Sequence, residues 1–169
     1  EPVPKTYITT LNGNKKYLPT LLQDKKTLII FYRGSWCPYC NQHLQGLKSI
    51  VDELQQKSFQ ILAISPDRHE LVQKQQLQGK IQYQLFSDSS MSAAKGFGIA
   101  FKLDQATVTM YKEKYKIDIE ADSGYQHHLL PVPAVFLIDQ DGIIQFAYSN
   151  ADYKIRLKPE TILKTAQSM

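Results

Sequence analysis

The two cysteines of this chain, Cys37 and Cys40, are separated by two residues and stand where an apolar run meets a helical pattern. Residues 27–32 are rich in apolar and β-branched side chains, which predicts a buried strand, and apolar residues recur with helical spacing after Cys40. A Cys-x-x-Cys pair between a strand and a helix is typical of a redox-active dithiol. The pair therefore favours folds in which a strand leads directly into the first turn of a helix.

The start of a helix suits thiolate chemistry because its unpaired N–H groups and its macrodipole favour negative charge. A free cysteine titrates near about 8.5, whereas dithiols of this spacing reach about 3.5 to 7. Pro38 fits the first helical turn, where its missing N–H costs nothing. In a helix Cys37 and Cys40 share one face. We expect them to form a reversible disulfide that serves as the redox centre, with no other cofactor.

Three other uses of the cysteines are less favoured. A static disulfide closing so short a loop gains little chain entropy. A zinc site needs two more ligands, and the four histidines show no ligand spacing among themselves, so no metal site is predicted. A c-type haem needs His directly after the second Cys, where this chain has Asn41.

The bulk composition fits one globular domain. The chain has 169 residues, of which 43% are hydrophobic. The net charge of +4 comes from scattered lysines rather than a dense basic block, so a nucleic-acid partner is not expected. No apolar stretch reaches the length of a membrane span. The chain starts at Glu1 without Met, and both export to a compartment such as the periplasm after removal of a leader and a cytoplasmic location stay open.

The order of the expected elements predicts an α/β sandwich with a mixed central sheet. Near-continuous apolar runs indicate strands that are covered on both faces. The expected elements are a β-hairpin over residues 7–18 around Asn12-Gly13, strands at 28–32, 59–65 and 84–88, helices at 37–57, 66–77 and 90–97, antiparallel strands at 134–139 and 143–148, and a helix at 160–167.

Residues 101–130 follow no simple pattern and are expected to form an insertion before the strand at 134–139. A segment of this length without clear structure is usually a functional loop. We expect a mobile flap near the dithiol, with a solvated insertion of no particular role as the alternative.

Two further motifs produce a resemblance to known families. Pro133, directly before the strand at 134–139, looks like the cis-proline that lies opposite the dithiol in the thioredoxin superfamily. More closely, residues 31–41 are similar to the signature of peroxiredoxin-like proteins of the AhpC/TSA family, as are residues 63–66, 130–133 and 151–153. The resemblance extends from about Tyr7 to Leu163. It implies one thioredoxin-like domain over residues 1–169 with a cis Val132–Pro133 bond.

The chain departs from the peroxiredoxin pattern around the cysteines. Aligning Cys40 with the peroxide-attacking cysteine puts Arg33 at the usual proline and Cys37 at the usual Thr or Ser. The usual arginine then falls at Pro133. These partners stabilise the transition state, so their absence should weaken peroxide chemistry. Arg33 is a candidate cationic neighbour of the thiolates, although an Arg at a strand end is also common as a solvated surface charge.

The resemblance and the dithiol together indicate a thiol–disulfide oxidoreductase of peroxiredoxin-like lineage, with Cys37 and Cys40 as catalytic residues. The thioredoxin pattern makes Cys37 the nucleophile toward protein disulfides, whereas the peroxiredoxin pattern makes Cys40 the nucleophile toward hydroperoxide. The expected reductant is a thiol or disulfide protein or a small thiol, and the chain is expected to be a monomer or homodimer.

Four neighbours of the dithiol are candidate supporting residues. Trp36 and Tyr39 would form an apolar lip, and Pro133 the opposing wall, with Val132 presenting its backbone to an extended substrate. Plain core or surface aromatics are the alternative for Trp36 and Tyr39.

A copper metallochaperone on the same fold is the alternative function. It would use both thiolates and a histidine such as His127 or His128, because thiolates select Cu(I). Metallochaperones of this fold space their cysteines one residue further apart, so the redox function is preferred.

Overall fold

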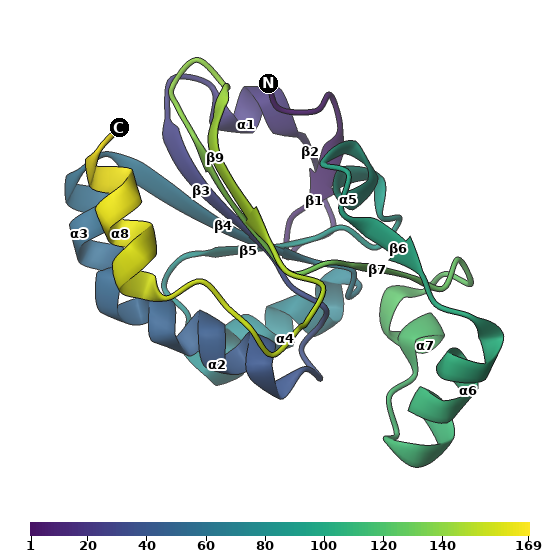
Figure 1. Cartoon of the computed structure of the whole chain (residues 1–169). Helices are drawn as coiled ribbons and strands as arrows, with labels where there is room; N and C mark the ends of the chain where they lie inside the picture. The colour runs from purple at the N-terminus through teal and green to yellow at the C-terminus, as the bar shows by residue number, and fades with distance from the viewer.

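A seven-stranded mixed sheet forms the centre of the computed structural model, which describes residues 1–169 (Figure 1). Its strands are β1 (Tyr7–Thr9), β2 (Lys15–Tyr17), β3 (Lys26–Phe31), β4 (Phe59–Ser65), β5 (Gln84–Ser87), β8 (Ala134–Ile138) and β9 (Ile144–Ser149). Their order across the sheet is β2-β1-β5-β4-β3-β8-β9. Strands β3, β4 and β5 run parallel, while β8 is antiparallel to β3 and to β9. The predicted mixed α/β sandwich and the N-terminal hairpin of β1 and β2 are confirmed.

Helices cover both faces of this sheet (Figure 1). They are α1 (Leu18–Leu22), α2 (Pro38–Gly46), the 3₁₀ turn η1 (Leu47–Ile50), α3 (Val51–Gln56), α4 (His69–Gly79), α5 (Ser92–Gly96), α6 (Gln105–Lys114), α7 (Ile119–Ser123) and α8 (Pro159–Gln167). No helix is both long enough and apolar enough to cross a bilayer.

Strand β3 shows how the core is divided. Its side chains alternate between the two faces because a strand is pleated. Leu28 and Ile30 pack into a cluster of 21 buried residues with α2, η1, α3, α4 and α8. Ile29 and Phe31 pack into a cluster of 16 buried residues with α1 and α5 on the other face. Burial on both sides explains why this strand reads as a continuous apolar run.

The helix expected over residues 37–57 is divided into α2, η1 and α3. Gly46 ends α2, and a glycine is a poor helix former. Ile50 then leaves helical geometry with φ −117° and ψ 1° before α3 begins. The change of direction keeps Leu47, Ile50, Val51 and Leu54 buried, so packing against the sheet outweighs continuity of the helix.

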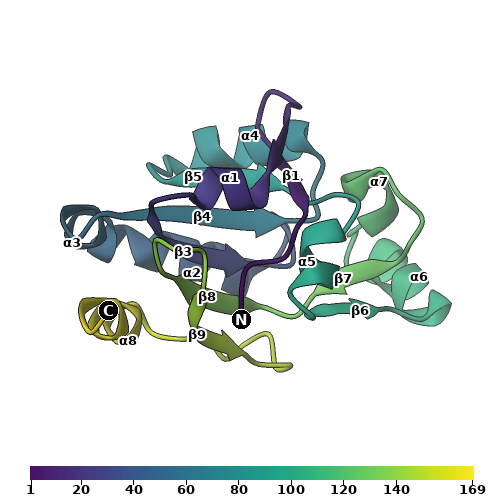
Figure 2. The ribbon, with the colours of Figure 1, turned by 90° about the horizontal axis from the view of Figure 1, so that it is seen from above.

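The insertion at 101–130 is structured, contrary to the expectation of a segment without clear elements. It contains α6 and α7, and it is joined to the body by a two-stranded sheet of β6 (Ala100–Lys102) and β7 (Leu129–Pro131). In both views this unit lies beyond one end of the central sheet (Figure 1, Figure 2). Asp104 and Asp118 cap its helices by accepting from the backbone N–H of Thr107 and Ala121. Its mobility stays a prediction.

The expected cis Val132–Pro133 bond is wrong, because the chain contains no cis peptide bond. Only Val132 and Pro133 separate β7 from β8, and the residue before a proline favours an extended conformation. The N–H of Val132 donates to the carbonyl of Ile99 at 2.7 Å, so it is not free to pair with an extended substrate.

Candidate active site

The two cysteines meet at the start of α2, as predicted. Cys37 is the N-cap residue, Pro38 is the first helical residue, and Cys40 follows within the first turn. The backbone N–H of Cys40 donates to Cys37 Sγ at 3.3 Å. Both thiols are free and buried, with 0% and 1% of their surface exposed. A substrate therefore reaches the sulfurs only after neighbouring groups move.

Arg156 places its guanidinium against both sulfurs of the dithiol. Its Nη2 lies 3.0 Å from Cys40 Sγ and 3.8 Å from Cys37 Sγ. It belongs to residues 150–158, a segment without helix or strand between β9 and α8. His43 Nε2 bonds the carbonyl of the adjacent Leu157 at 3.0 Å and anchors this segment to α2. Sequence reasoning missed Arg156, and its only signal was the family-like motif at 151–153 just before it.

The surroundings shift the pKa values of the two thiols in opposite directions. The Cys40 thiol and the Cys40 backbone N–H both donate to Cys37 Sγ, which together with Arg33 and Arg156 lowers the pKa of Cys37 to about 6 despite its burial. Burial raises the pKa of Cys40, and the neighbouring Cys37 charge raises it further. At neutral pH the pair therefore carries one negative charge, held mainly on Cys37.

Arg33 is buried, with 6% of its surface exposed, so the alternative that it is a solvated surface charge is wrong. Its Nη2 donates to the hydroxyl of Tyr111 at 2.6 Å. Its guanidinium stacks on the rings of Trp36 and Tyr153, with centroids at 4.8 Å and 4.3 Å. Aromatic faces attract a desolvated cation. Arg33 thus connects α6 and the 150–158 segment to the loop that carries Cys37.

The other candidate neighbours are placed around this cation. Trp36 is half-buried and packs edge-on against Tyr111 of α6, with ring centroids 6.0 Å apart. Tyr39 is 40% exposed and meets the edge of Tyr153 at 5.7 Å, which puts it at the rim. Pro133 lines a narrow crevice that it shares with His43 and Arg156. The side chain that is observed in contact with both sulfurs is that of Arg156.

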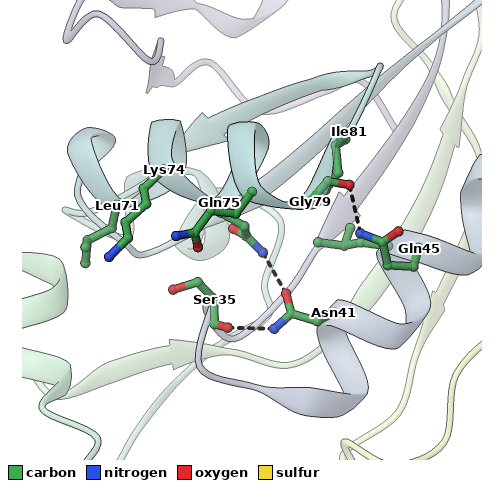
Figure 3. Close-up of a pocket in the computed structure, with 10 residues that line it drawn as sticks. Ser35, Asn41, Gln45, Leu71, Lys74, Gln75, Gly79 and Ile81 are labelled. Atoms are coloured by element: carbon green, nitrogen blue, oxygen red, sulfur yellow. Dashed lines mark hydrogen bonds between the residues drawn. The ribbon is translucent and has the colours of Figure 1, made fainter.

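A chain of side-chain hydrogen bonds supports the dithiol loop from the α4 side (Figure 3). The Tyr32 hydroxyl donates to Gln75 Oε1 at 2.7 Å, and Gln75 Nε2 donates to Asn41 Oδ1 at 2.9 Å. Asn41 Nδ2 then donates to the carbonyl of Ser35 at 2.6 Å. The cavity drawn in Figure 3 holds about 380 Å³, and neither cysteine lines it. These bonds fix the residues on both sides of the Cys-x-x-Cys pair.

Asp67 anchors the same loop from the end of β4. It is 1% exposed, and its Oδ2 accepts from the backbone N–H of Ser35 at 2.8 Å. Burial raises the pKa of this carboxyl to about 6, although the bonds with Ser35 oppose the rise. A charged carboxylate at this buried position therefore costs the fold stability at neutral pH.

Replacing Asp67 with asparagine is expected to stabilise the protein at neutral pH. The folded state holds the proton up to about pH 6, whereas the unfolded chain loses it near 3.8, so this group lowers stability as pH rises through that window. Each pKa unit is worth about 1.4 kcal/mol, so Asp67→Asn should gain about 2 to 3 kcal/mol near pH 7.5 and almost nothing near pH 4. Urea unfolding at both pH values measures the difference.

Asp88 provides the contrast for that measurement. The two carboxylate oxygens of Asp88 accept from the backbone N–H groups of Ala93 and Ala94, so Asp88→Asn leaves one of these N–H groups without an acceptor. In Asp67→Asn the remaining amide oxygen can still accept from the single N–H of Ser35. Burial raises the pKa of Asp88 to about 6 as well. A gain for Asp67→Asn that is the same at both pH values would contradict the assignment of the cost to a buried charge.

The structure does not support the copper alternative. No cluster of three or more His, Cys, Asp or Glu side chains is arranged to hold a metal ion. His127 Nε2 bonds the carbonyl of Ser89 at 2.8 Å, and His128 Nε2 bonds Glu120 at 2.8 Å. Neither histidine is placed with the thiols as a third ligand.

Comparison with protein families finds a match over most of the chain. The model of the AhpC/TSA family matches residues 1–147. Alkyl hydroperoxide reductase C of Staphylococcus haemolyticus (strain JCSC1435) is 26% identical over 136 residues, which cover 78% of this chain and 59% of that protein. Peroxiredoxin Bcp of Escherichia coli (strain K12) is 27% identical over 96 residues, which cover 57% of this chain and 61% of that protein. The chain thus spans about three fifths of these relatives.

Solved structures share the fold at low sequence identity. Peroxidoxin BcpB from Mycobacterium tuberculosis superposes with a TM-score of 0.75 and 18% identity, covering 100% of this chain and 96% of that one. Reduced Prx3 from Vibrio vulnificus in complex with hydrogen peroxide gives a TM-score of 0.79 and 17% identity, with 98% and 96% covered. The predicted thioredoxin-like fold is therefore confirmed.

Proposed function

The chain belongs to the AhpC/TSA family, and from that premise we propose that it is a thiol-dependent peroxidase and disulfide oxidoreductase working through Cys37 and Cys40. The observation that carries the proposal is the contact of one guanidinium, that of Arg156, with both sulfurs at the start of α2. A cation and a helix N-terminus together favour a reactive thiolate. The redox centre is the cysteine pair itself, with no bound cofactor.

The Cys37 thiolate is the attacking group toward hydroperoxide in this proposal. Its sulfur forms a bond to one peroxide oxygen while the O–O bond breaks, and the leaving alkoxide takes a proton to become an alcohol. Cys37 is then a sulfenic acid. The raised pKa of Cys40 keeps that residue a thiol at this stage, so it is a proton donor next to the leaving group.

The second step forms the disulfide. The Cys40 thiolate left by proton transfer lies 3.0 Å from Arg156 Nη2, which stabilises its charge. Cys40 attacks the oxidised sulfur of Cys37, the S–S bond forms, and hydroxide leaves as water after protonation. The dithiol and the hydroperoxide have then become a disulfide, an alcohol and water. A thiol partner reduces the disulfide by exchange and completes the cycle.

Movement of residues 150–158 gives the sulfurs access to substrate in this scheme. The segment carries Arg156, and it lacks the backbone ladder of a helix or strand. Its anchors include the contacts of Arg156 with the sulfurs, the bond from His43 to Leu157 and the packing of Tyr153 on Arg33 and Tyr39, which are almost all made by side chains. Segments held by few backbone bonds open most readily.

Thiol counting during peroxide turnover tests the proposal. Reduced protein treated with one equivalent of hydrogen peroxide should lose both thiols, and dithiothreitol should restore both and sustain peroxide consumption. Peroxide removal is followed in parallel, with a variant in which both cysteines are serine as the control. Two free thiols after exposure of folded protein to peroxide would overturn the dithiol mechanism.

A further inference from the structure

A polar cleft opens on the flank of α2 that faces the 150–158 segment. It has a volume of about 260 Å³ and is lined by Tyr39 and His43 from α2 and by Lys154 and Arg156 from the segment, among others. The cleft and the dithiol share Arg156, whose Nη2 contacts both sulfurs. A molecule bound in the cleft would therefore lie one side chain away from the redox centre.

The side chains that line the cleft include two cations and no carboxylate. No acidic side chain lines it, and neither Lys154 nor Arg156 belongs to any of the ion pairs in the structure. The nearby Asp152 accepts from the backbone N–H of Lys154. Arg156 Nε is buried and has no hydrogen-bond partner. Arg156 faces the thiolate in the reduced protein, and formation of the disulfide removes that negative charge. In the oxidised state an unpaired buried donor and two cations outside any carboxylate ion pair are the features of a site for an anion, and a carboxylate suits a guanidinium best.

His43 does not add a third charge. Its Nε2 bonds the carbonyl of Leu157, and burial lowers its pKa, so the ring is neutral near pH 7. The cleft thus offers two cations at one end and the half-exposed ring of Tyr39 for an apolar stem. Its volume corresponds to roughly eight or nine water molecules, which suits a small organic acid rather than a protein loop.

We propose that this cleft binds a low-molecular-weight thiol that carries a carboxylate, and that this thiol is the reductant of the Cys37–Cys40 disulfide. The inference rests on the disulfide of the proposed function. One thiolate bonds to a sulfur of the disulfide and breaks the Cys37–Cys40 bond. A second molecule of thiol then releases the first as its own disulfide, so two thiols are oxidised and both cysteines return to the reduced state.

Reduction of the isolated disulfide by three small thiols tests the proposal. 3-Mercaptopropionate is anionic, 2-mercaptoethanol neutral and cysteamine cationic, and Trp36 fluorescence in stopped flow reports the rate. Lys154→Met removes the charge and Lys154→Glu reverses it. The ratio of the anionic to the neutral rate should fall about fivefold in Lys154→Met, as expected for one exposed charge pair, and further in Lys154→Glu. Cysteamine should show the opposite order.

Differences in the intrinsic reactivity of the thiols cancel when the ratio of the anionic to the neutral rate is compared between variants, because the same thiols are used with every variant. Lys164→Met is the matched control, since Lys164 is an exposed lysine of α8 outside the cleft, and it should leave the ratio unchanged. The preference should also weaken with added salt. A ratio that is equal in wild type and both Lys154 variants overturns this inference while the disulfide stands. A chain that forms no disulfide overturns both the inference and the proposed function.

Discussion

Replacing Cys37 with serine is expected to abolish peroxide turnover, a loss of about 10³-fold or more, as for removal of a catalytic nucleophile. The reason is that Cys37 carries the negative charge of the pair, with its pKa lowered to about 6. Cys40→Ser should instead keep the first attack and lose the second, so that one equivalent of peroxide is consumed without recycling. Rapid-mixing peroxide assays on both variants measure the difference.

Trapping of the sulfenic acid identifies the attacking sulfur directly. Dimedone should label Cys37 in the Cys40→Ser variant, as read by mass spectrometry. Alkylation by iodoacetamide across a pH series should modify Cys37 first, with a midpoint near pH 6. Labelling of Cys40 in Cys37→Ser at the wild-type rate would reverse the assignment. It would make Cys40 the peroxide-attacking residue, as its alignment with the peroxiredoxin cysteine suggests.

Replacing Arg156 with methionine is expected to slow the reaction with peroxide by about 10²- to 10³-fold, the usual cost of removing one preorganised charge from a reacting centre. Methionine replaces the aliphatic stem of the arginine but offers no charge and no donor to the sulfurs. Without the cation the Cys37 thiolate is less stable, so its pKa should rise and the pH–rate profile should move to higher pH. The value of kcat/KM against pH measures both effects.

Arg156→Lys is the matched control for this prediction. Lysine keeps the charge, but its shorter side chain and compact ammonium do not reproduce the position of the Arg156 Nη2 between the two sulfurs, so it should recover the pH profile better than the rate. A structural role alone would change stability and leave the midpoint of the profile in place. A rate for Arg156→Met within about twofold of wild type would remove Arg156 from the mechanism.

The sequence by itself determined the local frame of the site. Apolar runs marked strands β3, β4 and β8, because strands buried on both faces need apolar side chains at every position. Cys37 as N-cap and Pro38 as the first helical residue follow from the preferences of a helix start. Gly13 in the hairpin turn, at φ 86°, was predictable because glycine tolerates a positive φ. Gly79, the last residue of α4, was predictable as a stop because glycine is a poor helix former. These features depend on neighbours within a few residues.

The insertion shows where such local patterns become too weak. Only Val108 of α6 is buried, so the helix has no apolar stripe to reveal it in the sequence. Its capping residues Asp104 and Asp118 were the available signals. The cis bond predicted at Pro133 failed for a related reason, since a proline alone does not decide the path of the chain between two strands.

Only the tertiary structure decided which charges surround the sulfurs. Arg156 is 119 residues from Cys37 in the chain and contacts it because the 150–158 segment packs against α2. Arg33 is buried because Trp36, Tyr111 and Tyr153, from three different segments, enclose its guanidinium. Contacts between distant segments follow from how the layers pack and leave no periodicity in the sequence. The dithiol could therefore be predicted from the sequence, whereas the arginines that shift the pKa values of its thiols could not.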